Sequence, residues 1–436
     1  MRPVATRVLV SALVALGSLA PFANEAGAQP PTTSVPIGAE PRTVTITPDG
    51  RLAYVTNEHA PTLTVVDTAT RAVVATVPIG GAQGSVAVTP DSRFAYVTWA
   101  DTGSHVAVID TSTNSVVDTI SVGNSPAGIA VSPNGQRVYV ADYYANAVSV
   151  IDTASNAVVD TIGVGSNPSS VAITPDGRFA YVADAYQTGS SGQVSVIDTT
   201  TDQVTQTVSG LGGEPWDIAI TPDGRFAYVA DFGGQVDVID TAHNTLSATV
   251  KLEPDSAVQG VAIAPNGQYA YVTDSRGNTN SFTVKAIRIS DNKVVASVDV
   301  GASPDGIAIT PDGRFAYVAD NSGDVTVIDL GSILVPTKLV AAPALLQESP
   351  LASNAFDLKV TLSRRSDGTP VAGKLIRMSA KGTVLCTATT NAQGAADCKA
   401  PLDQTLLKIV QQNGYIAVFP GDSQYATTSA TGKLVG

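Results

Sequence analysis

Aromatic and charged residues that could bind a ligand lie in short segments between apolar runs of this 436-residue chain. Aromatic rings stack on the apolar faces of sugars and peptides, and neighbouring carboxylates accept hydrogen bonds from hydroxyl and amide groups. We predict a ligand-binding role for a set that includes both tryptophans of the chain: Arg42, Trp99, Tyr143, Tyr144, Tyr186, Trp216, Asp217, Phe232 and Asp305. The alternative is that these side chains only cap strand ends and shield the interior.

The histidines of the chain argue against a histidine-rich metal site. His59, His105 and His243 fall in three different segments, whereas copper sites need dense histidine ligation. The sequence also lacks a Ser-His-Asp spacing, a zinc signature, a phosphate-binding loop and a dinucleotide fingerprint. We therefore predict a protein without catalytic residues. The alternative is a hydrolase, lactonase or lyase that uses carboxylates such as Asp217 and Asp305.

An internal repeat supplies the elements that would position these residues. Residues 170–184 read SVAITPDGRFAYVAD, and close copies recur 42 to 47 residues apart. Each unit offers four runs rich in Val, Ile, Thr and Tyr, separated by turn residues, as β-strands require. A four-stranded period of about 40 to 50 residues is typical of propeller blades, so we predict an all-β, seven-bladed β-propeller. The repeated proline marks the seven units at Pro48, Pro90, Pro133, Pro175, Pro222, Pro265 and Pro311.

The second run of each unit carries a recurring motif. Residues 54–57 read YVTN, and the other units carry variants such as YVAD at residues 181–184. Over about residues 33–330 the chain resembles the YVTN-type β-propeller repeats of many exported and surface-layer bacterial and archaeal proteins. The resemblance implies a fold and a cell-surface context rather than a reaction. In propellers, the loops from strand d to strand a and from strand b to strand c gather at one end of the central channel, where we expect the candidate residues.

The two ends of the repeat region predict how the ring closes. The seventh unit lacks a fourth strand, because the chain continues as GSIL over residues 331–334. Residues 34–38 read SVPIG and match the TVPIG of residues 76–80, the fourth run of the first unit. We therefore predict that the N-terminal strand completes the seventh blade, so that this blade keeps no ragged edge.

Most units end their second strand with an acidic residue. Ring symmetry would bring these carboxylates together, where they raise each other's pKa unless a hard cation such as calcium binds among them. We predict instead that each carboxylate accepts hydrogen bonds from its own loop. The site then requires no cofactor, and calcium is an example of a cation that such a ring could hold. The acidic residues are Asp142, Asp184, Asp231, Asp274 and Asp320, with Asn57 and Trp99 in the first two units.

The repeat ends before residue 336, which divides the chain into a predicted propeller of residues 29–335 and a second domain of residues 336–436. The stretches of residues 368–374 and 415–422 resemble the strand junction and the penultimate strand of bacterial Ig-like β-sandwich domains. Such domains are about 100 residues long, which fits the length available here.

Both cysteines of the chain fall in this second domain. Cys386 and Cys398 flank the turn-forming residues 391–394, which read NAQG. We predict a hairpin that places the two cysteines opposite each other, and a disulfide if the protein is exported.

The N-terminus reads as a secretory signal over residues 1–28. Arg2 and Arg7 precede an apolar run from Val8 to Ala20, and small residues follow at a spacing that a signal peptidase accepts. The run has 13 residues, against the ~20 that span a bilayer as a helix. We predict an exported protein, either periplasmic, secreted or held at the cell surface.

The charge and the architecture narrow the range of partners. A formal net charge of −13 argues against binding to nucleic-acid phosphates. No segment after the signal is long and apolar enough to cross a membrane. A propeller closes without a partner, so we expect a monomer. The predicted partner is a glycan or a protein of the cell envelope.

Overall fold

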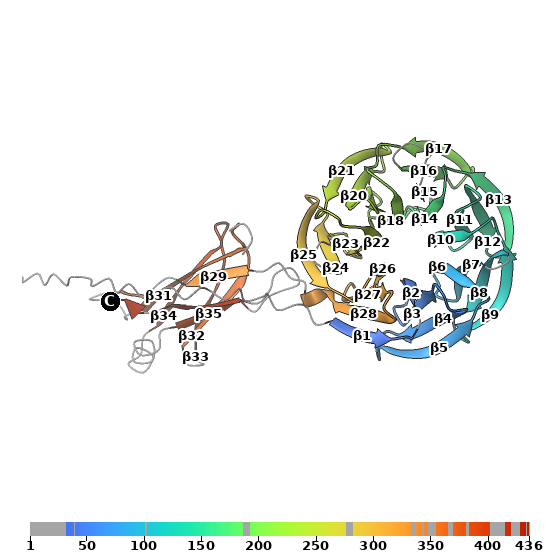
Figure 1. Ribbon diagram of the computed structural model, residues 1–436. Helices are drawn as coiled ribbons and strands as arrows, with labels where there is room; N and C mark the ends of the chain where they lie inside the picture. The colour runs from blue at the N-terminus through green and yellow to red at the C-terminus, as the bar shows by residue number, and fades with distance from the viewer. Residues whose placement is uncertain are drawn as a thin grey trace, which may run out of the picture.

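The computed structural model describes residues 32–38, 40–100, 103–185, 192–275, 282–332, 337–341, 344–347, 355–364, 369–380, 383–401, 415–419, 428–432 and 434–435. Seven four-stranded antiparallel sheets are arranged radially in a ring (Figure 1). The prediction of an all-β, seven-bladed β-propeller is confirmed. The predicted signal peptide and the predicted domain boundary at residues 335 and 336 lie outside the described residues.

Within each blade the strands follow the chain from the axis outward, and we call them strands a to d. The first blades are β2 (Pro41–Ile46), β3 (Leu52–Asn57), β4 (Thr62–Asp67) and β5 (Ala72–Pro78); β6 (Ala82–Val88), β7 (Phe94–Ala100), β8 (Ser104–Asp110) and β9 (Ser115–Ser121); and β10 (Pro126–Val131), β11 (Arg137–Asp142), β12 (Ala147–Asp152) and β13 (Ala157–Gly163). Blades four to six are β14 (Pro168–Ile173), β15 (Phe179–Asp184), β16 (Gln193–Asp198) and β17 (Gln203–Val208); β18 (Pro215–Ile220), β19 (Phe226–Asp231), β20 (Gln235–Asp240) and β21 (Thr245–Lys251); and β22 (Val258–Ile263), β23 (Tyr269–Asp274), β24 (Thr283–Arg288) and β25 (Lys293–Asp299).

The seventh blade combines the two ends of the repeat region. Its inner strands are β26 (Pro304–Ile309), β27 (Phe315–Asp320) and β28 (Asp324–Asp329), and its outer strand is β1 (Thr32–Pro36) (Figure 1). Strand β1 pairs antiparallel with β28, with Val35 opposite Val325. The predicted closure by the N-terminal strand is therefore confirmed. After β28 the chain makes a short 3₁₀ turn, η1 (Leu330–Ser332).

The middle strands of the blades form the core because both of their faces are covered. In β15, Ala180, Tyr181, Val182 and Ala183 are fully buried. Sheets that stack face to face lie about 10 Å apart, so small alanines beside larger valines fill the space between blades. The apolar runs of the repeat thus act as blade-to-blade packing surfaces.

In six blades the tyrosine of the repeated motif donates a hydrogen bond to the next blade around the ring. The Tyr54 hydroxyl of blade one donates to Oδ1 of Asn114 in blade two, 2.6 Å away, and Tyr139 donates to Oδ1 of Asp202 at 3.0 Å. Both acceptors have positive φ, which asparagine and aspartate tolerate better than other side chains. The buried phenols therefore have partners across the blade interface. Equivalent bonds join Tyr96, Tyr181 and Tyr228 to Asn156, Asn244 and Asn292.

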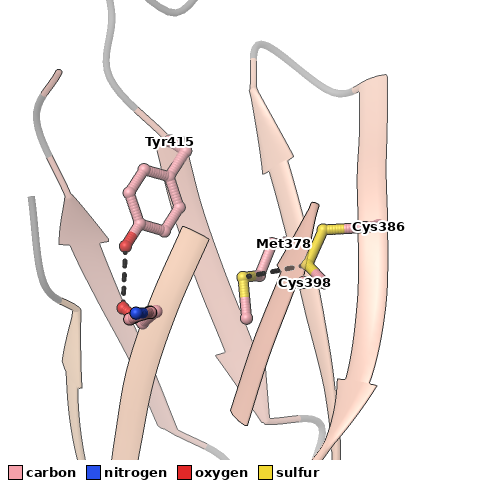
Figure 2. Close-up of a disulfide and its surroundings, with 5 residues drawn as sticks. Met378, Cys386, Cys398 and Tyr415 are labelled. Atoms are coloured by element: carbon pink, nitrogen blue, oxygen red, sulfur yellow. Dashed lines mark hydrogen bonds between the residues drawn. A yellow bond between two sulfur atoms is a disulfide. The ribbon is translucent and has the colours of Figure 1, made fainter. Parts of the chain in front are cut away.

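The C-terminal strands form two sheets that share one apolar core. One sheet contains β29 (Thr337–Ala341), β31 (Ala355–Arg364), β30 (Ala344–Gln347), β37 (Leu434–Val435) and β34 (Ala395–Pro401). The other contains β33 (Thr383–Thr389), β32 (Leu375–Ala380), β35 (Tyr415–Phe419) and β36 (Thr428–Gly432). Leu358, Ile376 and Tyr415 are buried between them, and the Tyr415 hydroxyl donates to the Lys359 carbonyl at 3.0 Å (Figure 2).

The two cysteines link the two sheets instead of the two strands of a hairpin. Cys386 lies in β33, which pairs with β32, whereas Cys398 lies in β34, which pairs with β31. Their sulfur atoms are at bonding distance and their Cα atoms are 6.5 Å apart (Figure 2). The predicted hairpin is therefore wrong, because the turn at residues 391–394 carries the chain from one sheet to the other.

Candidate ligand-binding site at the channel mouth

The innermost strand of every blade begins with a break in its pairing register. In β2 the break lies between Pro41 and Val44, and in β26 it lies between Pro304 and Ile307; the other five blades repeat it. A β-bulge of this kind changes the direction in which the side chains at the break point. Because these strands surround the axis, residues at the breaks line its open end.

A cavity of about 520 Å³ occupies this end of the channel and is lined by residues near the start of all seven innermost strands. Part of the b-to-c loop of blade three also lines it. The structure thereby brings together six of the nine residues selected from the sequence. They are Arg42, Tyr143, Tyr144, Trp216, Asp217 and Asp305.

Asp217 connects three neighbouring blades. Its Oδ1 accepts hydrogen bonds from the Ser170 hydroxyl of blade four at 2.8 Å and from its neighbouring Ile218 N–H at 2.9 Å. Its Oδ2 accepts a bond from the Val261 N–H of blade six at 3.0 Å. Burial raises the pKa of Asp217, and these three donors oppose that rise. The carboxylate is therefore held in place by the protein and shapes the cavity wall.

Asp305 lies at the same cavity with a different environment. Burial raises the pKa of its carboxyl to about 7; nearby Arg42 opposes the rise, and Glu58 and Asp217 add to it. Unlike Asp217, the Asp305 carboxyl accepts no hydrogen bond from any described residue. A carboxyl group in this position can accept a hydrogen bond from a ligand or exchange a proton near neutral pH.

The aromatic residues form two pairs beside these charges. The rings of Tyr143 and Tyr144 meet edge to face with centroids 5.1 Å apart, and Tyr144 is 67% exposed. The Trp216 ring lies 6.3 Å from that of Phe232. Phe232 does not line the cavity but packs beside Trp216, which does. The mouth therefore offers flat apolar surfaces next to charged groups.

Trp99 is not among the residues that line the cavity. It ends strand b of blade two, where its ring stacks on His105 with centroids 4.6 Å apart. It also lies so close to Gly80 that a Cβ there would fall 2.5 Å from the indole ring. Trp99 thus fills the space between the loops of its own blade. Tyr186 lies outside the described residues.

The acidic residues at the ends of strands b are buried separately. Oδ2 of Asp142 accepts a bond from the Ser149 hydroxyl at 2.6 Å, and Ser195 makes the same bond to Asp184. A Cβ at Gly123 would fall 2.5 Å from Oδ2 of Asp142, so the loop before strand a needs glycine at this point. The two serine donors lie in strand c of the same blade, so these bonds are local but do not come from the loop that the prediction named. Among the described residues, no group of three or more acidic, histidine or cysteine side chains could hold a metal ion.

Burial nevertheless raises the pKa of four of the acidic residues that end strands b. It raises the pKa of Asp142 and Asp231 to about 6 and that of Asp184 and Asp320 to about 7. Each of these four carboxyls also has one buried oxygen that accepts no hydrogen bond.

Sequence reasoning missed the polar residues that face the cavity from the innermost strands. Ser169, Ser170 and Gln259 line it beside Trp216. Each stands one or two positions before the Val or Ile that recurs in strand a, a register that identifies channel-facing positions once the bulge is known.

Comparisons with known proteins support the propeller. Three family models match parts of the chain: a YNCE-like beta-propeller over residues 81–173, a seven-bladed lactonase beta-propeller over residues 152–260, and an LVIVD repeat over residues 306–332. A search of curated proteins finds no match.

Among solved structures, the chain is similar to a chain of the hydrazine synthase of Kuenenia stuttgartiensis. The two are 27% identical with a TM-score of 0.61, and the similarity covers 67% of this chain and 96% of the other. The family models and this structure agree on a β-propeller.

Proposed function

We propose that this protein is an exported, non-catalytic β-propeller that binds a glycan or peptide ligand of the cell envelope at its channel mouth. The observation that supports this function is the cavity of about 520 Å³ that gathers Arg42, Asp305, Trp216 and the two tyrosines. Ligand sites are concave, have apolar walls and contain a few well-placed polar groups. The repeated scaffold holds the walls, while the side chains at the mouth differ from blade to blade.

Fluorescence of the two tryptophans tests this site directly. In Trp99→Phe the remaining indole lies at the cavity, and in Trp216→Phe it lies outside. Envelope glycans and peptide fragments that bind should shift the emission of Trp99→Phe and leave that of Trp216→Phe unchanged. The same ligands should be retained by wild-type protein and lost by Trp216→Ala, with little change in melting temperature. Equal responses from both single-tryptophan variants would remove the cavity as the site.

A lactonase is the second candidate, favoured by the match to seven-bladed lactonases over residues 152–260. Asp305, whose pKa of about 7 suits proton transfer at neutral pH, would act as the general acid or base. A screen of lactones and esters should then reveal turnover that Asp305→Asn abolishes and Asp160→Asn, an exposed control, retains. Turnover no greater than in buffer would count against this function.

The proposal also includes the export of the protein and a role for its C-terminal sheets. We infer that residues 1–28 are removed, that residues 336–436 form an Ig-like spacer or attachment domain, and that Cys386 and Cys398 are oxidised. No helix of the described residues is long and apolar enough to cross a membrane. Mass spectrometry of the mature protein should give a start near residue 29 and a mass 2 Da below that of the dithiol form. A disulfide of this loop length contributes roughly 2 to 3 kcal/mol.

A further inference from the structure

Two opposite charges stand side by side at the cavity. Arg42 and Asp305 occupy equivalent positions, each two residues before the recurring apolar residue of β2 and β26. These two strands approach closely, because a Cβ at Gly306 would lie 2.7 Å from the Cα of Thr43 and 3.0 Å from the Arg42 carbonyl oxygen. Both side chains line the same cavity.

The two charges do not neutralise each other directly. Neither the guanidinium of Arg42 nor the carboxyl of Asp305 makes an ion pair or a side-chain hydrogen bond with any described residue. They are nevertheless close enough for Arg42 to lower the pKa of Asp305 against the effect of burial. Asp217 lines the same cavity but accepts three hydrogen bonds from the protein, as expected of a carboxylate with a structural role. Arg42 and Asp305 keep their hydrogen-bonding capacity for a ligand.

We propose that the cavity binds a zwitterionic ligand of the amino-acid or short-peptide class, with its carboxylate on Arg42 and its ammonium group on Asp305. This inference rests on the proposed ligand-binding function and selects its peptide branch. A guanidinium binds a carboxylate through two parallel hydrogen bonds. The faces of Trp216 and Tyr143 offer a further attraction for a cation. A neutral sugar would instead leave both charges without a partner in a partly buried site.

Ligand binding should also move a proton. Arg42, Glu58 and Asp217 are the ionisable groups that affect Asp305, and Tyr143 and Tyr144 are the other ionisable groups that line the cavity. An ammonium group beside Asp305 favours its ionised form, so a fraction of the carboxyls releases a proton on binding near pH 7. Calorimetric titration in buffers of different ionisation enthalpy measures this release, which a purely apolar ligand would not cause.

The test uses full-length mature protein and three forms of each dipeptide. Ala-Tyr, Ala-Ala and Ala-Glu are compared with their N-acetylated and C-terminally amidated forms. Blocking either end should weaken binding at least about tenfold, since hydrogen bonds to charged groups are the stronger ones. Asp305→Asn should bind free and N-acetylated dipeptides alike, and Arg42→Gln should bind free and amidated dipeptides alike. Asp160→Asn, a change at an exposed position, should behave as wild type.

The possible binding results distinguish a failure of the zwitterion proposal from a failure of the proposed ligand-binding function. Equal affinity for free and blocked dipeptides would overturn the zwitterion assignment. Absence of dipeptide binding, together with a glycan that shifts Trp216 emission, would also overturn it and leave the proposed function intact. If neither class of ligand shifts Trp216 emission, both proposals are wrong. Retention of end-group selectivity in the doubly changed Arg42→Gln, Asp305→Asn protein would assign recognition to other residues.

Discussion

Blades five and six place opposite charges at the same position of the repeat. Strand b ends in Asp231 in blade five and in Asp274 in blade six. The strand-c position two residues beyond the one paired with the acid holds Asp237 in blade five and Lys285 in blade six. Blade three has the simpler solution of a serine, Ser149, that donates to the acid at 2.6 Å. The three blades therefore place an acid, a base and a hydroxyl group beside the buried carboxyl group that ends strand b.

Blade six neutralises its acid with a cation. Nζ of Lys285 lies 3.4 Å from Oδ2 of Asp274 and 2.8 Å from Oε2 of Glu253. The side chains of Lys285 and Asp274 are only 6% and 4% exposed. Asp274 also accepts bonds from the Ser256 hydroxyl at 2.8 Å and the Ala257 N–H at 3.2 Å. The Asp274 carboxylate thus has a cation and two hydrogen-bond donors beside it.

Blade five places a second carboxyl group near its acid, which takes up a proton more readily than a free aspartate does. Burial, together with the nearby Asp237, raises the pKa of Asp231 to about 6. One Asp231 oxygen accepts the Gly233 N–H at 2.7 Å, and the other has no partner. Asp237 accepts bonds from the Thr249 hydroxyl at 2.6 Å and the Gly212 N–H at 3.1 Å. The comparison teaches that this position of the blade can hold a cation or a second carboxyl group, and that the hydrogen-bond donors around the acid differ accordingly.

Removing the cation of blade six should give the largest effect. Lys285→Met leaves Asp274 buried without its counter-charge, and breaking such pairs typically costs about 3 kcal/mol or more. We expect a lower melting temperature and a lower midpoint in urea. Lys293→Met, an exposed position in the same blade, is the matched control and should change neither. Equal stabilities of the two variants would show that blade six does not depend on the pair.

Lowering the pH should stabilise the propeller, and this effect should be smaller than that of Lys285→Met. The ordinary pKa of aspartate is 3.8, whereas Asp231, Asp184 and Asp320 have pKa values of about 6 to 7 in the folded protein. The folded state therefore binds more protons between these values, and its stability falls as the pH rises through 6 to 7. We expect a melting temperature roughly 5 °C higher at pH 5 than at pH 8. Asp231→Asn should reduce this difference, whereas an unchanged or inverted slope would contradict the assignment.

The architecture could be predicted because it depends on features that recur. The period of the repeat gives the number of blades, and the match between residues 34–38 and 76–80 gives the closure. The disulfide partners could not be placed on the correct strands in this way. Turn signals are local, whereas the pairing of β34 with β31 joins distant segments.

The candidate site could be predicted only in part, because one residue type serves different repeat positions. Trp216 stands at the bulge of an innermost strand and reaches the cavity. Trp99 replaces the acid at the end of a strand b and packs within its own blade. Both lie beside loops at the same end of the ring, so nearness to those loops alone could not separate them. The bulge depends on the pairing of strands a and b, which no single segment reveals.

Replacing Asp237, the second carboxyl group of blade five, should give the smallest effect on stability. Unlike Lys285→Met, this change should stabilise the protein. Asp237→Ser introduces the hydroxyl that Ser149 and Ser195 supply in blades three and four, where it donates to the acid at 2.6 Å. One net hydrogen bond and the loss of repulsion should stabilise the protein by about 1 kcal/mol at pH 8. The gain should shrink at pH 5, where Asp231 is already protonated. The reciprocal Ser149→Asp should destabilise blade three at pH 8 by a similar amount. Chemical unfolding of both variants at the two pH values measures these differences, and a destabilised Asp237→Ser would mean that the bonds from Thr249 and Gly212 outweigh the repulsion.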